Sequence, residues 1–531
     1  MALTERYRGF TVASALRHRA TADPERVFIL HENHRLTFGE VDGQADALAA
    51  GLHSLGVEVG DRVALLLPPC PEFVVSMLAA AKLGALIVPL DPRLTPAELQ
   101  YMLRHSEAVA AVTAETYDEV EYLEVFEELM PQLPELQYLV TVGEEDLWYD
   151  DRIFQWEDLM SAGQGRDFPT PDLQADRDAF ALFYTSGTTG KPKAVSLSHA
   201  NLVHAAAGTA DALALAPEDR VAGVSALYHV FGMGPGVLGS LLAGSSLVLA
   251  DPLDAHRLLD LIEAHRITVQ YGIPTLFVTQ LQAQAERPRD ISSLRLGLVA
   301  GAPVREELAN RIEDELCPAL VIGYSLTETA SCVCLARPDD PEAKRHSTVG
   351  QPVADTEIRI VEGDQVLPVE SVGELLVRGP GVMLGYYRQP RETSHAFNPD
   401  GFLRTGDLAM VDEEGFIHLV GRKKDVIIRT GFNVYPREVE DRILVHPAVL
   451  EVAVVGTQDP VLGEAICACV VPVEGAIVSE QEIRDWCRMT LSELKVPDLV
   501  RFFDGFPRTG DGKIRRVELA RMVRSGSTSP A

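Results

Sequence analysis

The sequence is short of basic residues. Its 531 residues contain 47 Lys and Arg against 78 Asp and Glu, which gives a formal net charge of −31 at pH 7. This balance excludes a nucleic-acid-binding protein, because such proteins need a basic excess to displace counterions from phosphates. From Gly421 to the end there are 16 basic and 16 acidic residues, so the residues before it carry the whole net charge. This asymmetry indicates two separate bodies.

Cysteine is also scarce. Seven cysteines, an odd number without the spacing of a disulfide framework, predict reduced thiols in the cytosol. The pairs Cys332–Cys334 and Cys467–Cys469 could be read as metal ligands. Alternate residues of a strand share a face, however, and no nearby His or second pair completes a ligand set. We expect a structural role for both pairs.

The start of the chain lacks an apolar segment, so no signal peptide is predicted. Residues 221–250 lack Asp, Glu, Lys and Arg altogether, and this run exceeds the ~20 residues of a membrane helix. The run also contains His229, Pro235, six glycines and four serines, a mixture typical of a buried strand, loop and helix. We therefore expect no membrane span and a cytoplasmic protein.

Short β-branched runs alternate with longer helical patterns, which predicts an α/β fold with a mostly parallel sheet. One such unit has strands at 62–67 and 85–90, with a helix that begins at Pro71. Residues 358–377 and 415–420 differ, since they alternate in polarity and are interrupted by glycine. That pattern is typical of antiparallel or barrel strands.

We place a domain boundary after residue 421, where the charge balance changes, giving domains at 1–421 and 422–531. In the second domain, a helix is expected to begin at Pro436. Residues 449–455 and 466–473 are expected to form paired strands. The smaller domain is therefore predicted to be a compact α+β unit.

The most informative segment is Tyr184-Thr-Ser-Gly-Thr-Thr-Gly-Lys-Pro-Lys193, which follows a strand-like run. Its glycines let the backbone approach an anion, its hydroxyls donate hydrogen bonds, and its lysines supply charge. It is not a Walker loop, because only two residues separate the glycines and Lys191 precedes proline. It predicts a phosphate-binding loop formed by Thr185, Ser186, Gly187, Thr188, Thr189, Gly190 and Lys191.

This loop resembles that of the adenylate-forming superfamily, which includes acyl-CoA synthetases, peptide-synthetase adenylation domains and luciferases. Further motifs of the family follow in the family's order, and the resemblance covers nearly the whole chain, from Leu36 to Lys513. The resemblance implies a large N-terminal region with two sheet-and-helix subdomains and a distorted β-barrel. It also implies a small, mobile C-terminal domain.

The motif Tyr324-Ser-Leu-Thr-Glu-Thr329 resembles the family segment that holds adenine and magnesium. By this resemblance Tyr324 stacks on the adenine, Thr327 donates to the α-phosphate, and Glu328 is the Mg²⁺ ligand. A carboxylate with substrate phosphates suits this cation. The remaining segments assigned to adenine and ribose are Gly301-Ala302-Pro303, Asp407 and Arg422; the vicinal ribose hydroxyls can donate to the Asp407 carboxylate.

The resemblance also places an acyl pocket around His229, Gly301 and Ser325. Many coumarate-type relatives carry glycine at the position of Ser325, so the added bulk counts against a planar aryl acid. His229 is assigned to the pocket as a gate or support near the reacting carboxylate, with a satisfied core histidine as the alternative. No general base is assigned.

The segment Pro507-Arg-Thr-Gly-Asp-Gly-Lys513 resembles the family's C-terminal catalytic loop. Its lysine would neutralise the charge that develops as a carboxylate attacks the α-phosphate. Lys424 occupies the family's hinge position, and rotation there would replace Lys513 by the segment that contains Gly431 and Asn433. In that second orientation, Gly431 leaves room for a pantetheine arm.

These residues predict an ATP-dependent carboxylate–CoA ligase that uses ATP, Mg²⁺, CoA and a small carboxylic acid. The apolar run favours an apolar acid, such as a fatty acid or an aromatic acid, over an amino acid. An amine or a carrier-protein thiol as the acyl acceptor is the alternative for the second step. A catalytically silent acyl or nucleotide sensor is the alternative of another class, and the presence of every expected polar residue counts against it.

Overall fold

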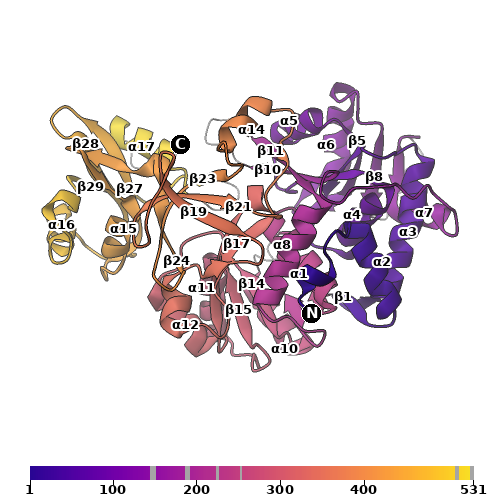
Figure 1. Cartoon of the computed structure of the whole chain (residues 1–531), viewed down its shortest axis with the longest axis horizontal. Coiled ribbons are helices and arrows are strands. Elements are labelled where there is room, and N and C mark those ends of the chain that lie inside the picture. The colour runs from indigo at the N-terminus through magenta and orange to yellow at the C-terminus, as the bar shows by residue number, and fades with distance from the viewer. Residues whose placement is uncertain (144–150, 186–191, 223–225, 251–253, 509–513, 527–531) are drawn as a thin grey trace. The chain divides into compact units, whose positions relative to one another are not determined.

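The computed structural model of the chain describes residues 1–143, 151–185, 192–222, 226–250, 254–508 and 514–526 (Figure 1). By packing, the chain forms two compact units. The first unit comprises Met1–Glu357 and Val377–Leu403, and the second comprises Ile358–Leu376 and Arg404–Ala531. The functional boundary after residue 421 stays a prediction, because the packing groups earlier strands with the C-terminal residues.

The first unit contains a nine-stranded sheet. Its central strands are parallel, and antiparallel strands flank them. The order is β18 (Gln351–Pro352), β17 (Ser331–Leu335), β16 (Leu320–Leu326), β15 (Leu296–Val299), β14 (Val269–Gly272), β12 (Arg220–Ala222), β13 (Ser246–Val248), β1 (Val27–His31) and β2 (His34–Thr37).

A second sheet of the first unit has eight strands. The order is β22 (Gly385–Tyr386), β11 (Lys193–Ser198), β10 (Ala179–Thr185), β4 (Leu86–Pro89), β3 (Arg62–Leu66), β5 (Ala108–Ala114), β8 (Tyr138–Val142) and β9 (Ile153–Gln155). The predicted strand–helix–strand unit at 62–90 is confirmed as β3, α4 (Pro71–Leu83) and β4, with β3 and β4 parallel.

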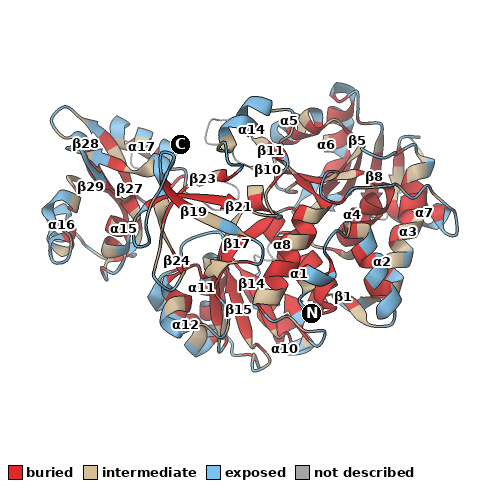
Figure 2. Ribbon diagram, viewed as in Figure 1, coloured by how far each residue is buried: buried red, intermediate tan, exposed pale blue. Residues whose placement is uncertain are grey.

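Helices cover both sheets. In Figure 1, α3 (Phe38–Ser54), α4 and α7 (Trp156–Gly163) lie beside the eight-stranded sheet, and α8 (His199–Ala212) lies between the two sheets. Near the nine-stranded sheet lie α10 (Ala255–His265), α11 (Pro274–Glu286) and α12 (Glu306–Glu315). Figure 2 shows β14 and β15 buried, with exposed residues on the outer faces of α10 and α12.

The uncharged run at 221–250 folds as a strand, a loop and a helix, as predicted. It contains β12, the π-helix η2 (Gly232–Leu238), α9 (Gly239–Ala243) and β13. Among the described residues, the helices are too short or too polar to cross a bilayer. All seven cysteines are free and buried, which agrees with the structural role expected of the two cysteine pairs.

The second unit holds two sheets. The first is a five-stranded sheet with the order β20 (Gln365–Val366), β19 (Glu357–Glu362), β21 (Gly373–Arg378), β23 (Leu403–Val411) and β24 (Ile417–Arg422). Antiparallel pairing of β19 with β20 and of β23 with β24 confirms the antiparallel strands predicted for this region.

The other sheet consists of β26 (Phe432–Val434), β25 (Ile427–Arg429), β28 (Gly463–Pro472), β27 (Val449–Asp459) and β29 (Leu499–Phe502). The long antiparallel pair β27–β28 confirms the two predicted strands. The helices are α15 (Pro436–Leu444), α16 (Glu480–Arg488) and α17 (Arg516–Ser525), and α15 begins at the predicted Pro436.

Candidate active site

The nine-stranded sheet brings three predicted segments to one edge. β12, β14, β15 and β16 are parallel neighbours, so their carboxyl ends share an edge. Gly301 follows β15, Tyr324 lies near the end of β16, and His229 follows β12 in the chain. In open α/β sheets, ligands bind outside the carboxyl ends of the strands. The predicted adenine, phosphate and acyl positions therefore belong to the edge where such sites form.

The segment after β15 is exposed and requires glycine. Gly301 has a φ of +88°, a left-handed conformation that glycine adopts without steric cost. Gly301, Ala302 and Pro303 are all exposed, whereas Ala300 before them is buried. The buried strand thus ends in an accessible segment with small side chains, as a nucleotide-lining segment requires.

The segment after β16 is held in a strained conformation. A bulge interrupts the pairing of β16 with β17 between Tyr324 and Ser325, and bulges re-aim side chains near active sites. A short 3₁₀ helix, η3 (Thr327–Thr329), follows. Ala330 and Ser331 then have φ angles of +55° and +120°. Non-glycine residues with such angles cost free energy and cluster at functional sites.

Glu328 is a half-buried carboxylate in η3. The Tyr386 hydroxyl donates to its Oε1 atom at 2.9 Å. Burial raises the pKa of the Tyr386 phenol, and the neighbouring Glu328 carboxylate raises it further, so the hydroxyl is a proton donor at neutral pH. The sequence analysis missed Tyr386, whose β22 strand of two residues is too short to show a periodic pattern.

The ends of the phosphate loop form an antiparallel pair. Thr185 of β10 is opposite Lys193 of β11, while Ser186–Lys191 lie outside the described residues. Helix α5 (Pro96–Ser106) contacts both ends. The Tyr184 hydroxyl donates to the Met102 carbonyl at 3.0 Å, and the Tyr101 hydroxyl donates to the Pro192 carbonyl at 3.3 Å. One helix therefore fixes the entry and the exit of the predicted loop.

His229 is half-buried rather than enclosed in the core. Its ring lies 5.0 Å from that of Tyr228. The Tyr228 hydroxyl accepts a hydrogen bond from the Arg93 guanidinium, which pairs with Asp91 at 3.0 Å. The π-helix η2, whose seven residues are all buried, follows His229. This environment agrees better with a pocket margin than with a fully buried core histidine.

In the second unit, the structure pairs Asp407 with Arg422. The two residues are opposite each other on β23 and β24, and Arg422 Nε lies 2.6 Å from Asp407 Oδ1. The Asp407 side chain is 8% exposed and that of Arg422 is 50% exposed. The Thr405 hydroxyl accepts from the Asp407 backbone N–H at 3.0 Å and donates to the Leu375 carbonyl at 2.7 Å. The predicted ribose carboxylate is therefore buried and paired with a more exposed cation.

The predicted hinge residue Lys424 is exposed in the 3₁₀ helix η4 (Lys423–Asp425). Its neighbour Lys423 is anchored, since Lys423 Nζ lies 2.9 Å from Oε2 of the buried Glu374. On the other side, Asp425 lies 3.8 Å from Arg516. Lys424 thus stands between two residues that are tied to other parts of the second unit.

Gly431 lies in a tight hairpin turn. Arg429 and Phe432 are opposite each other on β25 and β26, so Thr430 and Gly431 form a two-residue loop with φ angles of +50° and +83°. This is the pattern of a type I′ turn. A Cβ atom at Gly431 would meet nothing within 4 Å, and Asn433 is exposed. Lys513 lies outside the described residues.

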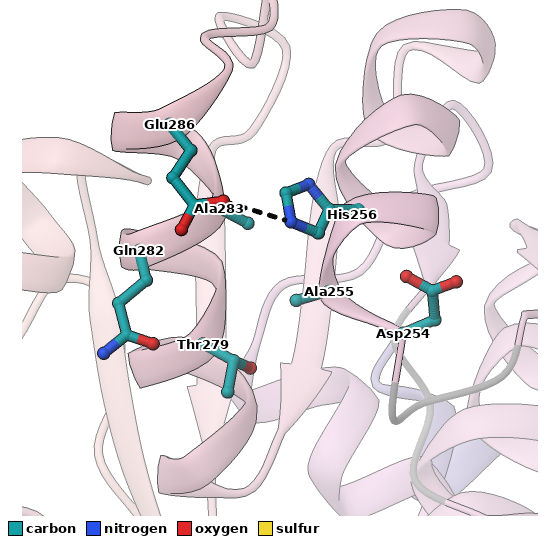
Figure 3. Close-up of a pocket in the computed structure, with 7 residues that line it drawn as sticks. All are labelled: Asp254, Ala255, His256, Thr279, Gln282, Ala283 and Glu286. Atoms are coloured by element: carbon teal, nitrogen blue, oxygen red, sulfur yellow. Dashed lines mark ion pairs between the residues drawn. The ribbon is translucent and has the colours of Figure 1, made fainter.

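A pocket of about 500 Å³ lies between α10 and α11 (Figure 3). Its walls carry His256 and Glu286, which face each other and form an ion pair at 3.5 Å. None of the predicted site residues lines this pocket.

Comparisons with known proteins identify the family. Residues 16–387 match the AMP-binding enzyme family, and residues 438–513 match the AMP-binding enzyme C-terminal domain. The medium-chain acyl-CoA ligase ACSF2 of Bos taurus is 34% identical, over 94% of this chain and 84% of that protein. The feruloyl-CoA synthase of an Amycolatopsis species is 36% identical, over 95% and 97%. The chain belongs to the adenylate-forming acyl-CoA synthetases.

The fold comparison agrees. The crystal structure of ATP-bound MatB from Rhodopseudomonas palustris is 29% identical and superposes with a TM-score of 0.87, covering 97% of this chain and 99% of that one. The chain described here is thus an acyl-CoA synthetase. It uses ATP to convert a carboxylic acid into the acyl adenylate, with release of pyrophosphate, and then transfers the acyl group to CoA. CoA is thus the acyl acceptor, and not an amine or a carrier-protein thiol. The chain is an enzyme, and not a catalytically silent sensor.

Proposed function

We propose that the acid used by this acyl-CoA synthetase is apolar, either a fatty acid or an aromatic acid, and that it lies between His229 and the π-helix η2. The supporting observation is that all seven residues of η2 are buried and none is charged. Such a lining gives no compensation for the ammonium group of an amino acid, and an unpaired buried charge is costly.

The relatives support this class of acid. By their names, one acts on medium-chain acids and another on ferulate. The Arg93 guanidinium reaches the His229 segment through the Tyr228 hydroxyl, and its charge is compensated by Asp91 at 3.0 Å. A second carboxylate on the substrate would therefore compete with Asp91 for this cation.

We assign roles in ATP binding to the predicted residues one by one. Tyr324 stacks on the adenine, and Gly301, Ala302 and Pro303 line its other side. Thr327 donates to the α-phosphate, and the phosphate loop binds the leaving pyrophosphate. Asp407 accepts hydrogen bonds from the ribose hydroxyls, with Arg422 beside it. The exposed segment 301–303 and the pairing of the Asp407 carboxylate with Arg422 at 2.6 Å support these roles.

Glu328 fits a magnesium ligand. Its carboxylate is a hard oxygen donor, and it is half-buried next to a segment that a nucleotide would occupy. Tyr386 binds Oε1, and among the described residues nothing bonds to Oε2. When bound, Mg²⁺ would neutralise phosphate charge during pyrophosphate release.

For the second step, we assign the β25–β26 hairpin to the CoA site. The open space around Gly431 would admit the pantetheine arm, and the exposed Asn433 can bond to its amides or to the acyl carbonyl. Lys424 is the hinge about which residues 422–531 rotate, and Lys513 serves the first step. We also propose a cytoplasmic location, in keeping with seven reduced thiols.

The test is a panel of acids, read by pyrophosphate release and by mass spectrometry of the CoA thioester. Medium-chain fatty acids and aromatic acids should give acyl-CoA, whereas amino acids should give neither product. Preference for an amino acid or a dicarboxylic acid would overturn the proposed substrate class.

A variant at Ser325 sharpens this test. Ser325→Gly removes bulk at the predicted acyl pocket, so the ratio of kcat/KM for aromatic acids to that for aliphatic acids should rise by roughly tenfold. The aliphatic acid is the internal control, because both ratios come from the same enzyme. An unchanged ratio would remove Ser325 from the pocket.

A further inference from the structure

Tyr386 lies between two parts of the site that are far apart in the sequence. Its hydroxyl donates to Glu328 Oε1 at 2.9 Å. On its other side, the Lys193 ammonium lies 4.8 Å from the centre of the Tyr386 ring. Lys193 is the first residue of β11 after the phosphate loop. One tyrosine thus contacts both the predicted metal ligand and the exit of the phosphate loop.

The backbone around Tyr386 is fixed by the same two elements. β22 pairs antiparallel with β11, with Tyr386 opposite Val195. The Leu384 backbone N–H donates to the Ser196 carbonyl at 3.0 Å, and the Met383 N–H donates to the Glu328 carbonyl at 2.9 Å. Segment 383–386 therefore holds Glu328 by its backbone as well as by its side chain.

A further bond restricts Tyr386 itself. Its backbone N–H donates to the Thr393 hydroxyl at 2.9 Å. The backbone is thus held by Thr393, while the phenol bonds to Glu328. A hydrogen bond to an ionised carboxylate is stronger than one between neutral groups and fixes the orientation of the acceptor. Oε1 keeps one lone pair after accepting this bond and Oε2 keeps both, so Oε2 is the more available oxygen for a cation.

We propose that Tyr386 is a positioning residue that sets the Glu328 carboxylate for magnesium–nucleotide binding, while its ring contacts Lys193. The proposal rests on the role assigned to Glu328 above. Tyr386 does not touch the reacting atoms. Its effect is to restrict the orientation of the carboxylate that would hold the metal.

The test is Tyr386→Phe, which removes the hydroxyl and keeps the ring over Lys193. The dissociation constant of a non-hydrolysable ATP analogue, measured by calorimetry, should rise about tenfold in the presence of Mg²⁺ and remain unchanged in its absence. Thiolation of supplied acyl adenylate should also be unchanged. The matched control is Tyr138→Phe at the far end of the same sheet, where neither measurement should change.

A double-mutant cycle separates this proposal from the one it depends on. Glu328→Gln alone should weaken the Mg²⁺-dependent binding, and Tyr386→Phe should then add less than about a twofold change. If Glu328→Gln leaves binding unchanged, the assignment of Glu328 is wrong. If Glu328→Gln weakens binding but the two effects multiply independently, the assignment stands and the positioning role of Tyr386 is wrong.

Discussion

At the scale of single residues, two of the carboxylates predicted to bind substrate are each held by a polar neighbour. Asp407 is nearly buried and pairs with Arg422 at 2.6 Å, while Thr405 orients its backbone. Glu328 is oriented by Tyr386. In both cases a ligand would find a carboxylate already in place, which lowers the entropy lost on binding.

Asp407→Asn keeps the size of the side chain and removes its charge. Because hydrogen bonds to a charged group contribute about 1.5–3 kcal/mol, the KM for ATP should rise by roughly tenfold or more. Steady-state kinetics with saturating acid and CoA measure this change. The control is Asp364→Asn, which affects a carboxylate that is 85% exposed and pairs with Arg404. If both variants raise the KM equally, Asp407 does not contact the nucleotide.

A second residue-scale prediction concerns His199 in the first unit. Burial lowers the pKa of His199 to about 4, although Asp178 partly opposes the shift. The ring is 1% exposed, and its Nδ1 accepts a hydrogen bond from the Val12 backbone N–H at 3.3 Å. The neutral ring is therefore the folded form, and protons bind more readily to the unfolded chain.

The direction in which pH changes the stability follows from this difference in proton binding. The stability contribution is complete above pH 6.5 and is lost as the pH falls towards 4. Between pH 7.5 and pH 5, His199 should cost the wild type about 2 kcal/mol of unfolding free energy. His199→Asn should flatten this part of the profile, measured by urea unfolding at both pH values, whereas the exposed His34→Asn should leave it unchanged. An equal slope in all three proteins would contradict the prediction.

At the scale of elements, the β25–β26 hairpin shows how backbone geometry limits substitution. Thr430 and Gly431 both have positive φ, as a type I′ turn requires. The space around Gly431 is open, so a side chain there costs backbone strain and blocks the surface without creating an internal clash. This combination makes the turn suitable for testing the CoA site.

Gly431→Leu should reduce the thiolation of supplied acyl adenylate and leave adenylation unchanged. The backbone strain should cost about 1–2 kcal/mol of stability. Gly475→Leu is the matched control, since Gly475 also has a positive φ and open space around it. Gly475→Leu should lose similar stability in thermal unfolding while thiolation is retained. Loss of thiolation in both variants would assign the effect to strain alone.

At the scale of the whole molecule, the sequence predicted the elements better than their contacts. The strands at 62–66 and 86–89 and the long β27–β28 pair follow from short apolar runs, because such runs are typical of buried strands. The contact between Tyr386 and Glu328 could not be predicted, since 58 residues separate them. The two-residue strand β22 acquires its conformation from β11, not from its own pattern.

The division into units was predicted only in part. The charge change near Gly421 indicates a second body, yet the packing places Ile358–Leu376 with the C-terminal residues. Those strands belong to the same five-stranded sheet as β23 and β24. Neither the charge pattern nor the periodicity of the sequence predicts which strands pair. The residues assigned to the site were predicted through their motifs, and the side chains that contact them were seen only in the structure.

The proposed mechanism assigns different residues to the two steps, and Lys513 to the first step alone. The structure describes the residues on either side of the Lys513 segment. Arg508 and Ile514 form an isolated antiparallel β-bridge, and the Arg515 N–H donates to the Pro507 carbonyl at 2.8 Å. Lys495→Ala is the control for the Lys513→Ala variant described next. Lys495 is a lysine of the same unit, and it pairs with Glu438 at 2.6 Å.

The decisive measurement compares both half-reactions in Lys513→Ala. Adenylation, followed as acid-dependent pyrophosphate release, should fall by about 10²–10³, the effect of removing one electrostatic contact in a transition state. Thiolation of supplied acyl adenylate should proceed at the rate of the wild type. An equal loss in both steps, or no loss in the first, would contradict an enzyme in which Lys513 serves adenylation only.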